Sequence, residues 1–411
     1  MKVLLINKFY YMRGGSETYN FALAEALKAK GHEVIFFAMQ DEKNLPCEQS
    51  KYFVPNVDYN QQGGIKEKIS AVKNFFYSKI AAAKMKELIE DEKPDIAHIG
   101  LLHRQITFSV VEVLKEYGIP VVMTMHDLIF ACPNYTMLTN GTVCEACMEG
   151  SVYNCVKKKC VKESFSKSIL AACEKEFLLH KKYYDLIDLY ITECVFYKQL
   201  MEKSGVTNSR IISRTNFLPI TQKYEFNKNY KDYILYFGRF SKEKGIQTLL
   251  EAHKEMQCKY KLILVGDGPI KKEIESFIEA NKLTNIELPG AIYGEEMEAI
   301  IEGARVVVTP SEWYENCPYA LLQSIAMGKI EIVSEVGGLP ELVEDGKTGF
   351  LYESGNPKEL ADKIDRVMSM TKDEYERMSE VICTKAKERH NWEPYVDMLI
   401  SEYKNLISEQ V

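Results

Sequence analysis

Apolar and polar positions follow two alternating patterns along this chain. Short apolar runs, each long enough for one buried strand, are separated by stretches with apolar residues at helical spacing. In the first half the runs predict strands at Lys2–Phe9, Glu33–Met39, Asp95–Ile99, Pro120–Met125 and Asp188–Thr192. Helices are predicted over Glu17–Lys30, residues 65–89 and Thr107–Tyr117. Alternation of this kind predicts a parallel sheet covered by helices.

The alternation lapses over residues 213–231, where polar, uneven sequence predicts a linker, and then restarts. The second set of strands is predicted at Tyr233–Phe237, Lys261–Val265, Asn285–Leu288, Arg305–Thr309, Lys329–Ser334 and Gly349–Tyr352. Helices are predicted near 245–256, 270–281, 295–303, 318–327 and 357–369, and then from Asp373 to about Ser408 with a break at Trp392–Pro394. The fold class is therefore α/β, with two doubly wound domains facing a cleft, and ligand-binding residues are expected just after strands.

Composition narrows the function classes. The chain has 411 residues, is 46% hydrophobic and carries a net charge of −7, which excludes general disorder and argues against nucleic-acid binding. No apolar run approaches the roughly 18 residues of a membrane span, so we expect a cytoplasmic protein with reduced thiols. The charge is uneven, because residues 60–86 carry six lysines against one glutamate, and residues 151–183 carry eight lysines against three glutamates.

Three glycine-rich turns follow predicted strands. Residues 14–17 (GGSE) join a strand to a helix whose first N–H groups could face an anion, or they form an ordinary capped turn. Residues 238–245 (GRFSKEKG) place Arg239 and Lys244 where a diphosphate would lie, or they form a solvated charge run. Residues 266–269 (GDGP) predict a tight turn into a helix.

The most specific motif is residues 310–323 (PSEWYENCPYALLQ), between a strand and a helix. Glu315 lies in the turn, and Gln323 lies about two helical turns further on, close to the same face. A carboxylate and a polar acceptor in this arrangement could hold the hydroxyls of a sugar and a ribose. Residues 334–343 (SEVGGLPELV) form another glycine-rich turn into a helix.

Taken in order, the motifs GGSE, GRFSKEKG, GDGP, PSxWYEN and VGGLPELV resemble those of the retaining glycosyltransferases of family four, which have the GT-B architecture. The resemblance covers nearly the whole chain and is closest in kind to bacterial capsule and exopolysaccharide enzymes. It implies an acceptor-binding Rossmann-like domain over 1–214 and a nucleotide-sugar domain over 215–390. It also implies that a C-terminal helix, 391–411, crosses back to the first domain.

The resemblance also implies roles for individual residues. Arg239 and Lys244 would hold the diphosphate, Glu315 the hydroxyls of the donor sugar, and His126 would lie near the reaction centre, although a histidine that ends a strand can be structural. These four form the predicted catalytic set. The remaining predicted donor-binding residues are Gly15, Gly266, Gly290, Asn316, Cys317, Pro318 and Gln323.

The family's second glutamate is replaced here by Gln323, which loses a charge-assisted bond to the ribose. The implied activity is a retaining, metal-independent hexosyl transfer from a nucleotide-sugar, with a UDP-sugar expected, to a glycan or lipid-linked acceptor in surface polysaccharide biosynthesis. No cofactor is required for it. Two alternatives stay open: a nucleotide-sugar epimerase of the same fold, and a non-catalytic nucleotide-sugar-binding protein.

A cysteine-rich insertion covers about 130–162. Cys144, Cys147, Cys155 and Cys160 have zinc-ligand spacing, with Cys132 nearby. A structural zinc would stabilise a segment with little core of its own, and the alternative is free or redox-active thiols.

The basic helix predicted at 64–89 has an apolar stripe and two aromatic residues expected to be exposed, Phe75 and Tyr77. Such a helix can lie peripherally on an anionic membrane surface. The alternative is an ordinary helix packed on the first sheet with its lysines in water.

Overall fold

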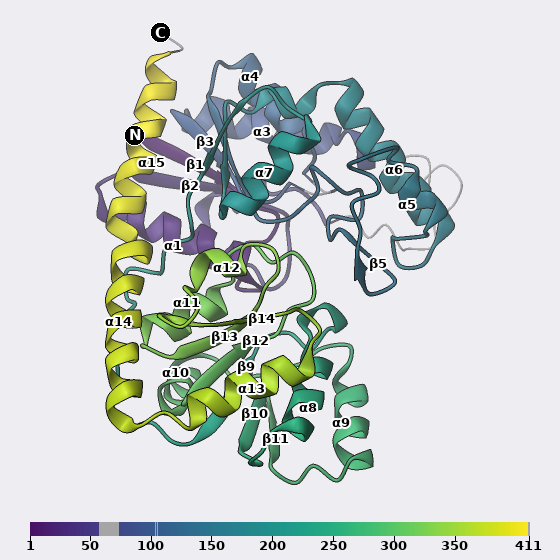
Figure 1. Cartoon of the computed structure of the whole chain (residues 1–411). Helices are drawn as coiled ribbons and strands as arrows, with labels where there is room; N and C mark the ends of the chain where they lie inside the picture. The colour runs from purple at the N-terminus through teal and green to yellow at the C-terminus, as the bar shows by residue number, and fades with distance from the viewer. Residues whose placement is uncertain (57–73, 103, 105, 410–411) are drawn as a thin grey trace. The chain divides into compact units, whose positions relative to one another are not determined.

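The computed structural model describes residues 1–56, 74–102, 104 and 106–409 (Figure 1). The chain forms two compact units. Unit 1 comprises residues 1–136, 145–220 and 392–411, and unit 2 comprises residues 137–144 and 221–391. The main segment of unit 2 begins at Thr221, a few residues after the predicted boundary, and the last helix belongs to unit 1.

Unit 1 is built on a six-stranded parallel sheet of order β2-β1-β3-β4-β7-β8. Its strands are β1 (Lys2–Ile6), β2 (Glu33–Phe37), β3 (Ile96–Ile99), β4 (Val121–Met125), β7 (Leu189–Thr192) and β8 (Arg210–Ser213). Its helices are α1 (Gly15–Ala29), α3 (Lys79–Glu92), α4 (Ser109–Glu116), α5 (Asn154–Lys157), α6 (Phe165–His180), α7 (Val195–Ser204) and α15 (Trp392–Ser408). The strand order reverses between β1 and β3, which marks the place where such sheets bind ligands.

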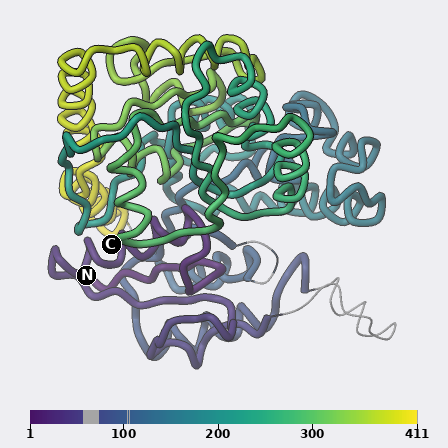
Figure 2. Tube along the Cα trace, turned by 90° about the horizontal axis from the view of Figure 1, so that it is seen from below, coloured from purple at the N-terminus to yellow at the C-terminus, as the bar shows by residue number. Residues whose placement is uncertain are grey.

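Unit 2 repeats the plan with the order β11-β10-β9-β12-β13-β14, again all parallel. Its strands are β9 (Tyr233–Phe237), β10 (Lys261–Val265), β11 (Ile286–Gly290), β12 (Val306–Thr309), β13 (Ile330–Ser334) and β14 (Gly349–Tyr352). Its helices are α8 (Ile246–Glu255), α9 (Lys271–Ala280), α10 (Gly294–Gly303), α11 (Tyr319–Ala326), α12 (Leu339–Leu342), α13 (Pro357–Met368) and α14 (Lys372–His390). The reversal lies between β9 and β12, and the alternation of strand and helix can be followed along the tube in Figure 2.

The prediction of two α/β sheets is confirmed, and most of the predicted elements are present. Three details differ. The first strand ends at Ile6, and the side chain of Asn7 donates to the carbonyl of Phe9. The edge strand β8 and the short hairpin of β5 (Leu138–Thr139) and β6 (Thr142–Val143) were not predicted. Residues 57–73 of the predicted basic helix lie outside the described residues, and its described part is interrupted at Ser78, which caps α3.

The C-terminal helix α15 packs against α1 in unit 1 (Figure 1). Buried Tyr395, Leu399 and Tyr403 recur along one face of this helix at a spacing of four residues. The helix therefore contributes to the core of the first sheet, although it is the last element of the chain. Within the described residues, no helix is long and apolar enough to span a membrane.

Candidate active site

In unit 2, the turn after β9 and the turn after β12 bring a lysine onto a buried carboxylate. Lys244 Nζ donates to Glu315 Oε1 at 2.5 Å, and Ser311 Oγ donates to the same oxygen at 2.6 Å. Lys244 also lies over the Trp313 ring, 5.1 Å from its centroid. The two predicted residues therefore meet at the point where the strand order reverses.

Glu315 is ionised although it is only 5% exposed. Burial acts to raise the pKa of this carboxyl, but the charge and hydrogen bond of Lys244, with the hydrogen bond of Ser311, outweigh it and lower the pKa. A charged carboxylate that is prepared in this way can accept hydrogen bonds from sugar hydroxyls.

Glycines allow the turns that carry this pair to approach closely. Gly245 has a φ of 65°, and a Cβ there would lie 1.8 Å from the carbonyl oxygen of Pro310. Gly337 has a φ of 61°, and its Cβ would lie 2.5 Å from the carbonyl oxygen of Glu315, which also accepts from Gly338 N at 2.8 Å. Because only glycine fits at both positions, the glycine-rich motifs fix the backbone around Glu315.

The other predicted donor residues lie at the same edge of the second sheet. Arg239 follows β9 and is exposed, Gly266 follows β10, and Gly290 ends β11. Asn316 and Cys317 are buried between Glu315 and α11, Pro318 caps that helix, and Gln323 lies half-exposed within it. In the described residues, only Lys244 and Glu315 of this set form an ion pair with each other.

In unit 1, His126 is held by a carboxylate that the sequence analysis missed. His126 follows β4 and Glu193 follows the neighbouring strand β7, and Nδ1 of His126 lies 2.6 Å from Oε1 of Glu193. Both side chains are about 5–6% exposed. Burial acts to lower the pKa of His126, but the charge and hydrogen bond of Glu193 raise it overall. The pair therefore favours the protonated form of the imidazole.

The other ring nitrogen of His126 has no hydrogen-bond partner among the described residues, and the same holds for Oδ1 of Asn7. Asn7 follows β1 and donates to Glu17 in the first turn of α1, at 3.1 Å. A Cβ at Gly100 would lie 2.8 Å from Asn7 Oδ1 and 3.5 Å from His126 Nε2, so both polar atoms border this glycine. Two buried polar atoms that lie close together, each without a hydrogen-bond partner, form a favourable binding position for a polar ligand. The predicted Gly15 begins α1 beside this cluster.

A chain of buried hydrogen bonds connects the surroundings of His126 to α15. Tyr19 packs edge-on against His126 with ring centroids 5.0 Å apart, and its hydroxyl pairs with Tyr395 at 2.8 Å and with Thr124 at 3.1 Å. Thr124 also contacts His98, which is hydrogen-bonded to Tyr403. Burial lowers the pKa of His98 to about 3, so this histidine is neutral and acts as a structural link.

The predicted zinc ligands are not arranged as a metal site. In the described part of the chain, which includes all eleven cysteines, no group of three or more His, Cys, Asp or Glu residues is placed to hold a metal ion. Cys144 belongs to unit 2, whereas Cys147 and Cys160 pack against buried Cys155 in unit 1. Burial, with contributions from neighbouring thiols, raises the pKa of Cys155 to about 12, which keeps it protonated.

The prediction of an exposed aromatic face near residue 75 is wrong for Phe75. This side chain is 3% exposed and packs against Phe76, with ring centroids 5.7 Å apart.

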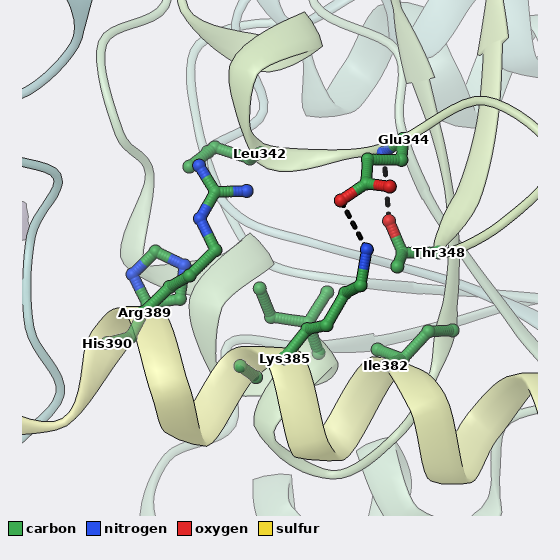
Figure 3. Close-up of a pocket in the computed structure, with 9 residues that line it drawn as sticks. Leu342, Glu344, Thr348, Ile382, Lys385, Arg389 and His390 are labelled. Atoms are coloured by element: carbon green, nitrogen blue, oxygen red, sulfur yellow. Dashed lines mark hydrogen bonds and ion pairs between the residues drawn. The ribbon is translucent and has the colours of Figure 1, made fainter.

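A small pocket against α14 in unit 2 is separate from the predicted site residues (Figure 3). Lys385 pairs there with Glu344, whose backbone N–H donates to Thr348 at 2.8 Å. Arg389 donates to the carbonyl of Glu341 at 2.8 Å. Because these polar groups satisfy one another, the pocket is a gap in helix packing.

Comparison with known proteins connects both units to one family. Residues 13–212 match the family described as "Glycosyltransferase Family 4", and residues 220–382 match "Glycosyl transferases group 1". Together the two matches cover most of both units.

Similar individual proteins fall in the same group. The chain is 23% identical to the N-acetyl-alpha-D-glucosaminyl L-malate synthase of Bacillus anthracis over 91% of this chain and 89% of the relative. It is 24% identical to an uncharacterized 42.6 kDa protein in the cps region of Klebsiella pneumoniae, over 83% of this chain and 87% of the relative. It is 34% identical to an uncharacterized glycosyltransferase of Methanocaldococcus jannaschii, but this match spans 35% of the chain and only 40% of the relative.

Solved structures share the fold. Sucrose-phosphate synthase of Thermosynechococcus elongatus superposes with a TM-score of 0.72 at 18% identity, covering 100% of each chain. HepE of Anabaena, solved with UDP-glucose, superposes with a TM-score of 0.67 at 16% identity, covering 98% of this chain and 99% of the other. At these identities the likeness concerns the fold alone.

Proposed function

Because this chain belongs to family 4 of the glycosyltransferases, with the GT-B fold, we propose that it is a retaining hexosyltransferase. It would move a sugar from a UDP-sugar to a glycan or lipid-linked acceptor in a surface polysaccharide pathway. The observation that carries the proposal is the Lys244–Glu315 pair, which lies where the second sheet reverses its strand order. HepE, solved with UDP-glucose, supports the choice of donor.

The donor would be held by unit 2. Lys244 and the exposed Arg239 would face the diphosphate and offset the charge that develops on it as the bond to the sugar breaks. Glu315 would accept hydrogen bonds from the sugar hydroxyls, while Ser311 Oγ donates to its Oε1. Because Arg239 and Lys244 would offset the charge of the diphosphate, we propose that the reaction needs no metal ion.

The transfer would proceed on one face of the sugar. The acceptor hydroxyl forms the new glycosidic bond at the anomeric carbon as the bond to the diphosphate breaks, and its proton passes to the leaving phosphate oxygen. His126 would donate a hydrogen bond from Nε2 to the reacting sugar, with Glu193 fixing the ring and its charge.

A cytoplasmic location and contact with an anionic membrane surface form a further part of the proposal. They rest on the basic stretches of unit 1, where Lys157, Lys158 and Lys159 are exposed. Flotation with anionic vesicles at low salt tests this part, and absence of binding would remove it.

A thermal-shift screen across UDP-, GDP- and ADP-sugars tests the donor, followed by product analysis with the donor that stabilises the protein most. We expect a UDP-sugar to be selected and transfer to persist in the presence of a chelator. Loss of activity with chelator and its recovery with magnesium would contradict the proposed role of the two cations. Donor turnover without acceptor would instead favour the epimerase, and binding without any product would favour the non-catalytic protein.

A further inference from the structure

Asn7 and Glu17 of unit 1 are buried polar residues to which the proposed function gives no role. Asn7 is the first residue after β1, and Glu17 is the last residue of the GGSE motif, in the first turn of α1. Each is only 2% exposed. Carboxylate and amide side chains are seldom buried so completely unless other groups pair with their polar atoms.

The orientation of the Asn7 amide is fixed by its neighbours. Nδ2 of Asn7 donates to the carbonyl of Phe9 at 2.9 Å and to Glu17 Oε1 at 3.1 Å. Ser16 Oγ donates to the same Glu17 oxygen at 2.9 Å, which holds the carboxylate in place. The reverse orientation of the amide would set its oxygen against two acceptor oxygens. The direction in which Oδ1 points is therefore determined by Glu17 and Phe9.

The oxygen of this amide lies beside the imidazole of His126. A Cβ on Gly100, which follows β3, would lie 2.8 Å from Asn7 Oδ1 and 3.5 Å from His126 Nε2. Because glycine has no Cβ, the ends of β1, β3 and β4 can bring the amide and the ring together here. In the part of the chain that the structure describes, neither Oδ1 nor Nε2 has a hydrogen-bond partner. Nε2 is thus available to a ligand and has an acceptor oxygen next to it.

The titratable groups that face His126 are Glu193 after β7, Glu17 and Tyr19 of α1, Asp127 next in the chain, and His98 on β3. Burial acts to lower the pKa of His126, whereas the charges of Glu193, Glu17 and Asp127 act to raise it. His98 adds no competing positive charge, because burial lowers its pKa to about 3. Glu17 is therefore a second carboxylate, after Glu193, whose charge favours the imidazolium.

We propose that Glu17 and Asn7 are positioning residues for His126: Glu17 fixes the Asn7 amide, and the amide oxygen beside Nε2 stabilises the imidazolium that donates to the reacting sugar. Glu193 holds the ring from Nδ1, and Asn7 would act on the side of Nε2. The inference rests on the proposed function for the role of His126. It gives the glutamate of the GGSE motif a task that the glycines of that motif do not explain.

The test is an NMR titration of the His126 Cε1–H signal in the full chain, assigned with His126→Ala. Glu17→Gln removes the charge but keeps an oxygen for the Asn7 amide, and Asn7→Ala removes the amide oxygen. We expect both variants to lower the pKa of His126, by less than Glu193→Gln does. Asn405→Ala, an exposed asparagine on α15, is the matched control and should titrate like the unchanged chain.

Kinetics separates positioning from charge. At a pH below the limb that reports His126, Asn7→Ala and Glu17→Leu should lower kcat about three- to tenfold, the effect of one lost hydrogen bond, with the KM for the donor unchanged. Glu17→Gln should keep kcat close to normal, because the Asn7 amide stays fixed. If Asn7→Ala does not fold, Gly100→Ala replaces it, since its methyl group would displace the Asn7 oxygen and should lower kcat in the same way.

The titration needs no turnover, so this inference and the proposed function can fail separately. An unchanged pKa of His126 in both Glu17→Gln and Asn7→Ala would overturn the inference, even if both variants lost thermal stability. Sugar transfer by the unchanged chain would then leave the transferase proposal standing. If the pKa shifts as expected but no nucleotide-sugar is turned over, the proposed function fails and the arrangement around His126 stands.

Discussion

The two units have the same architecture, but they position the candidate site residues at the carboxyl ends of their strands in different ways. In unit 2, the key pair comes from two neighbouring turns, and glycines at 245 and 337 let the backbones touch so that Lys244 meets Glu315. In unit 1, His126 depends on Glu193 from another strand and, through Tyr19, on Tyr395 of the last helix. Both pairs join turns that are far apart in the sequence, but glycine-rich motifs mark the turns of the proposed donor edge, whereas the proposed acceptor edge has no such motif around Glu193 and also depends on the last helix.

The largest expected effect comes from separating the unit 2 pair. Lys244→Gln leaves Glu315 buried without its cation and removes charge from the proposed diphosphate site. We expect kcat to fall by about 10²–10³-fold, the size seen when one stabilising donor is removed. Steady-state kinetics with the selected donor measures this.

The matched control for this variant is Lys254→Gln, on the last turn of α8, which should keep normal kinetics. A double variant, Lys244→Met with Glu315→Gln, separates the two roles. It should recover thermal stability, because no buried charge is left unpaired, while activity stays low. Wild-type activity in Lys244→Gln would contradict the account.

The corresponding change in unit 1 should have a smaller and pH-dependent effect. Glu193→Gln removes the charge that raises the pKa of His126, so the limb of the pH–kcat profile that reports His126 should move to lower pH. We expect kcat to fall about tenfold, and Glu193→Asp to restore part of it. A purely structural role for Glu193 would lower stability but leave the position of that limb unchanged.

Glu331, buried on β13 of the second sheet, gives unit 2 its own pH dependence of stability. Burial raises the pKa of this carboxyl to about 8, although hydrogen bonds from Ser324 and Thr309 act to lower it. The folded protein therefore keeps a proton that the unfolded chain loses near 4.5. The contribution of Glu331 to the free energy of unfolding is therefore complete below that pH. It decreases as the pH rises toward 8, by at most about 1.4 kcal/mol per pH unit.

Glu331→Gln should remove this slope, because an amide keeps hydrogen bonds without titrating. Denaturant unfolding at pH 5, 6, 7 and 8 checks it, with the exposed Glu298→Gln as control. Equal slopes in Glu331→Gln and the unchanged chain would show that Glu331 is ionised in the folded state.

The smallest effect is expected at Gln323, on the half-exposed face of α11. Gln323→Glu restores a charged acceptor for ribose hydroxyls, so donor affinity should stay the same or rise a few-fold. Calorimetry with the donor measures it. If the substitution abolished binding, Gln323 would not have the proposed ribose-facing role.

The difference between the two units also explains what the sequence could predict. The strand–helix alternation predicted both sheets, and the motifs after the strands singled out Lys244 and Glu315, although not the ion pair between them. Glu193 could have been found by the same rule, since it directly follows a predicted strand. The contribution of α15 could not, because Tyr395 and Tyr403 have the spacing of any packed helix and their partners lie 376 and 305 residues away in the sequence.

The cysteine spacing and the exposed aromatic prediction at Phe75 show what local patterns leave open. The regular spacing groups four cysteines in the sequence, but Cys144 falls in unit 2, whereas Cys147 and Cys160 pack against Cys155 in unit 1. Likewise, Phe75 has helical spacing that fits either a surface stripe or a core, and the structure places it in the core. Local patterns specify which elements form, whereas burial decides what their side chains do.

The most direct test of the division of roles is UDP affinity, measured by calorimetry on three proteins: the unchanged chain, Lys244→Gln and His126→Ala. The account predicts that UDP binds the unchanged chain and His126→Ala equally, and binds Lys244→Gln about tenfold or more weakly, as loss of a charge-assisted contact requires. Equal UDP affinity in the unchanged chain and Lys244→Gln would contradict the claim that unit 2 holds the donor through this lysine.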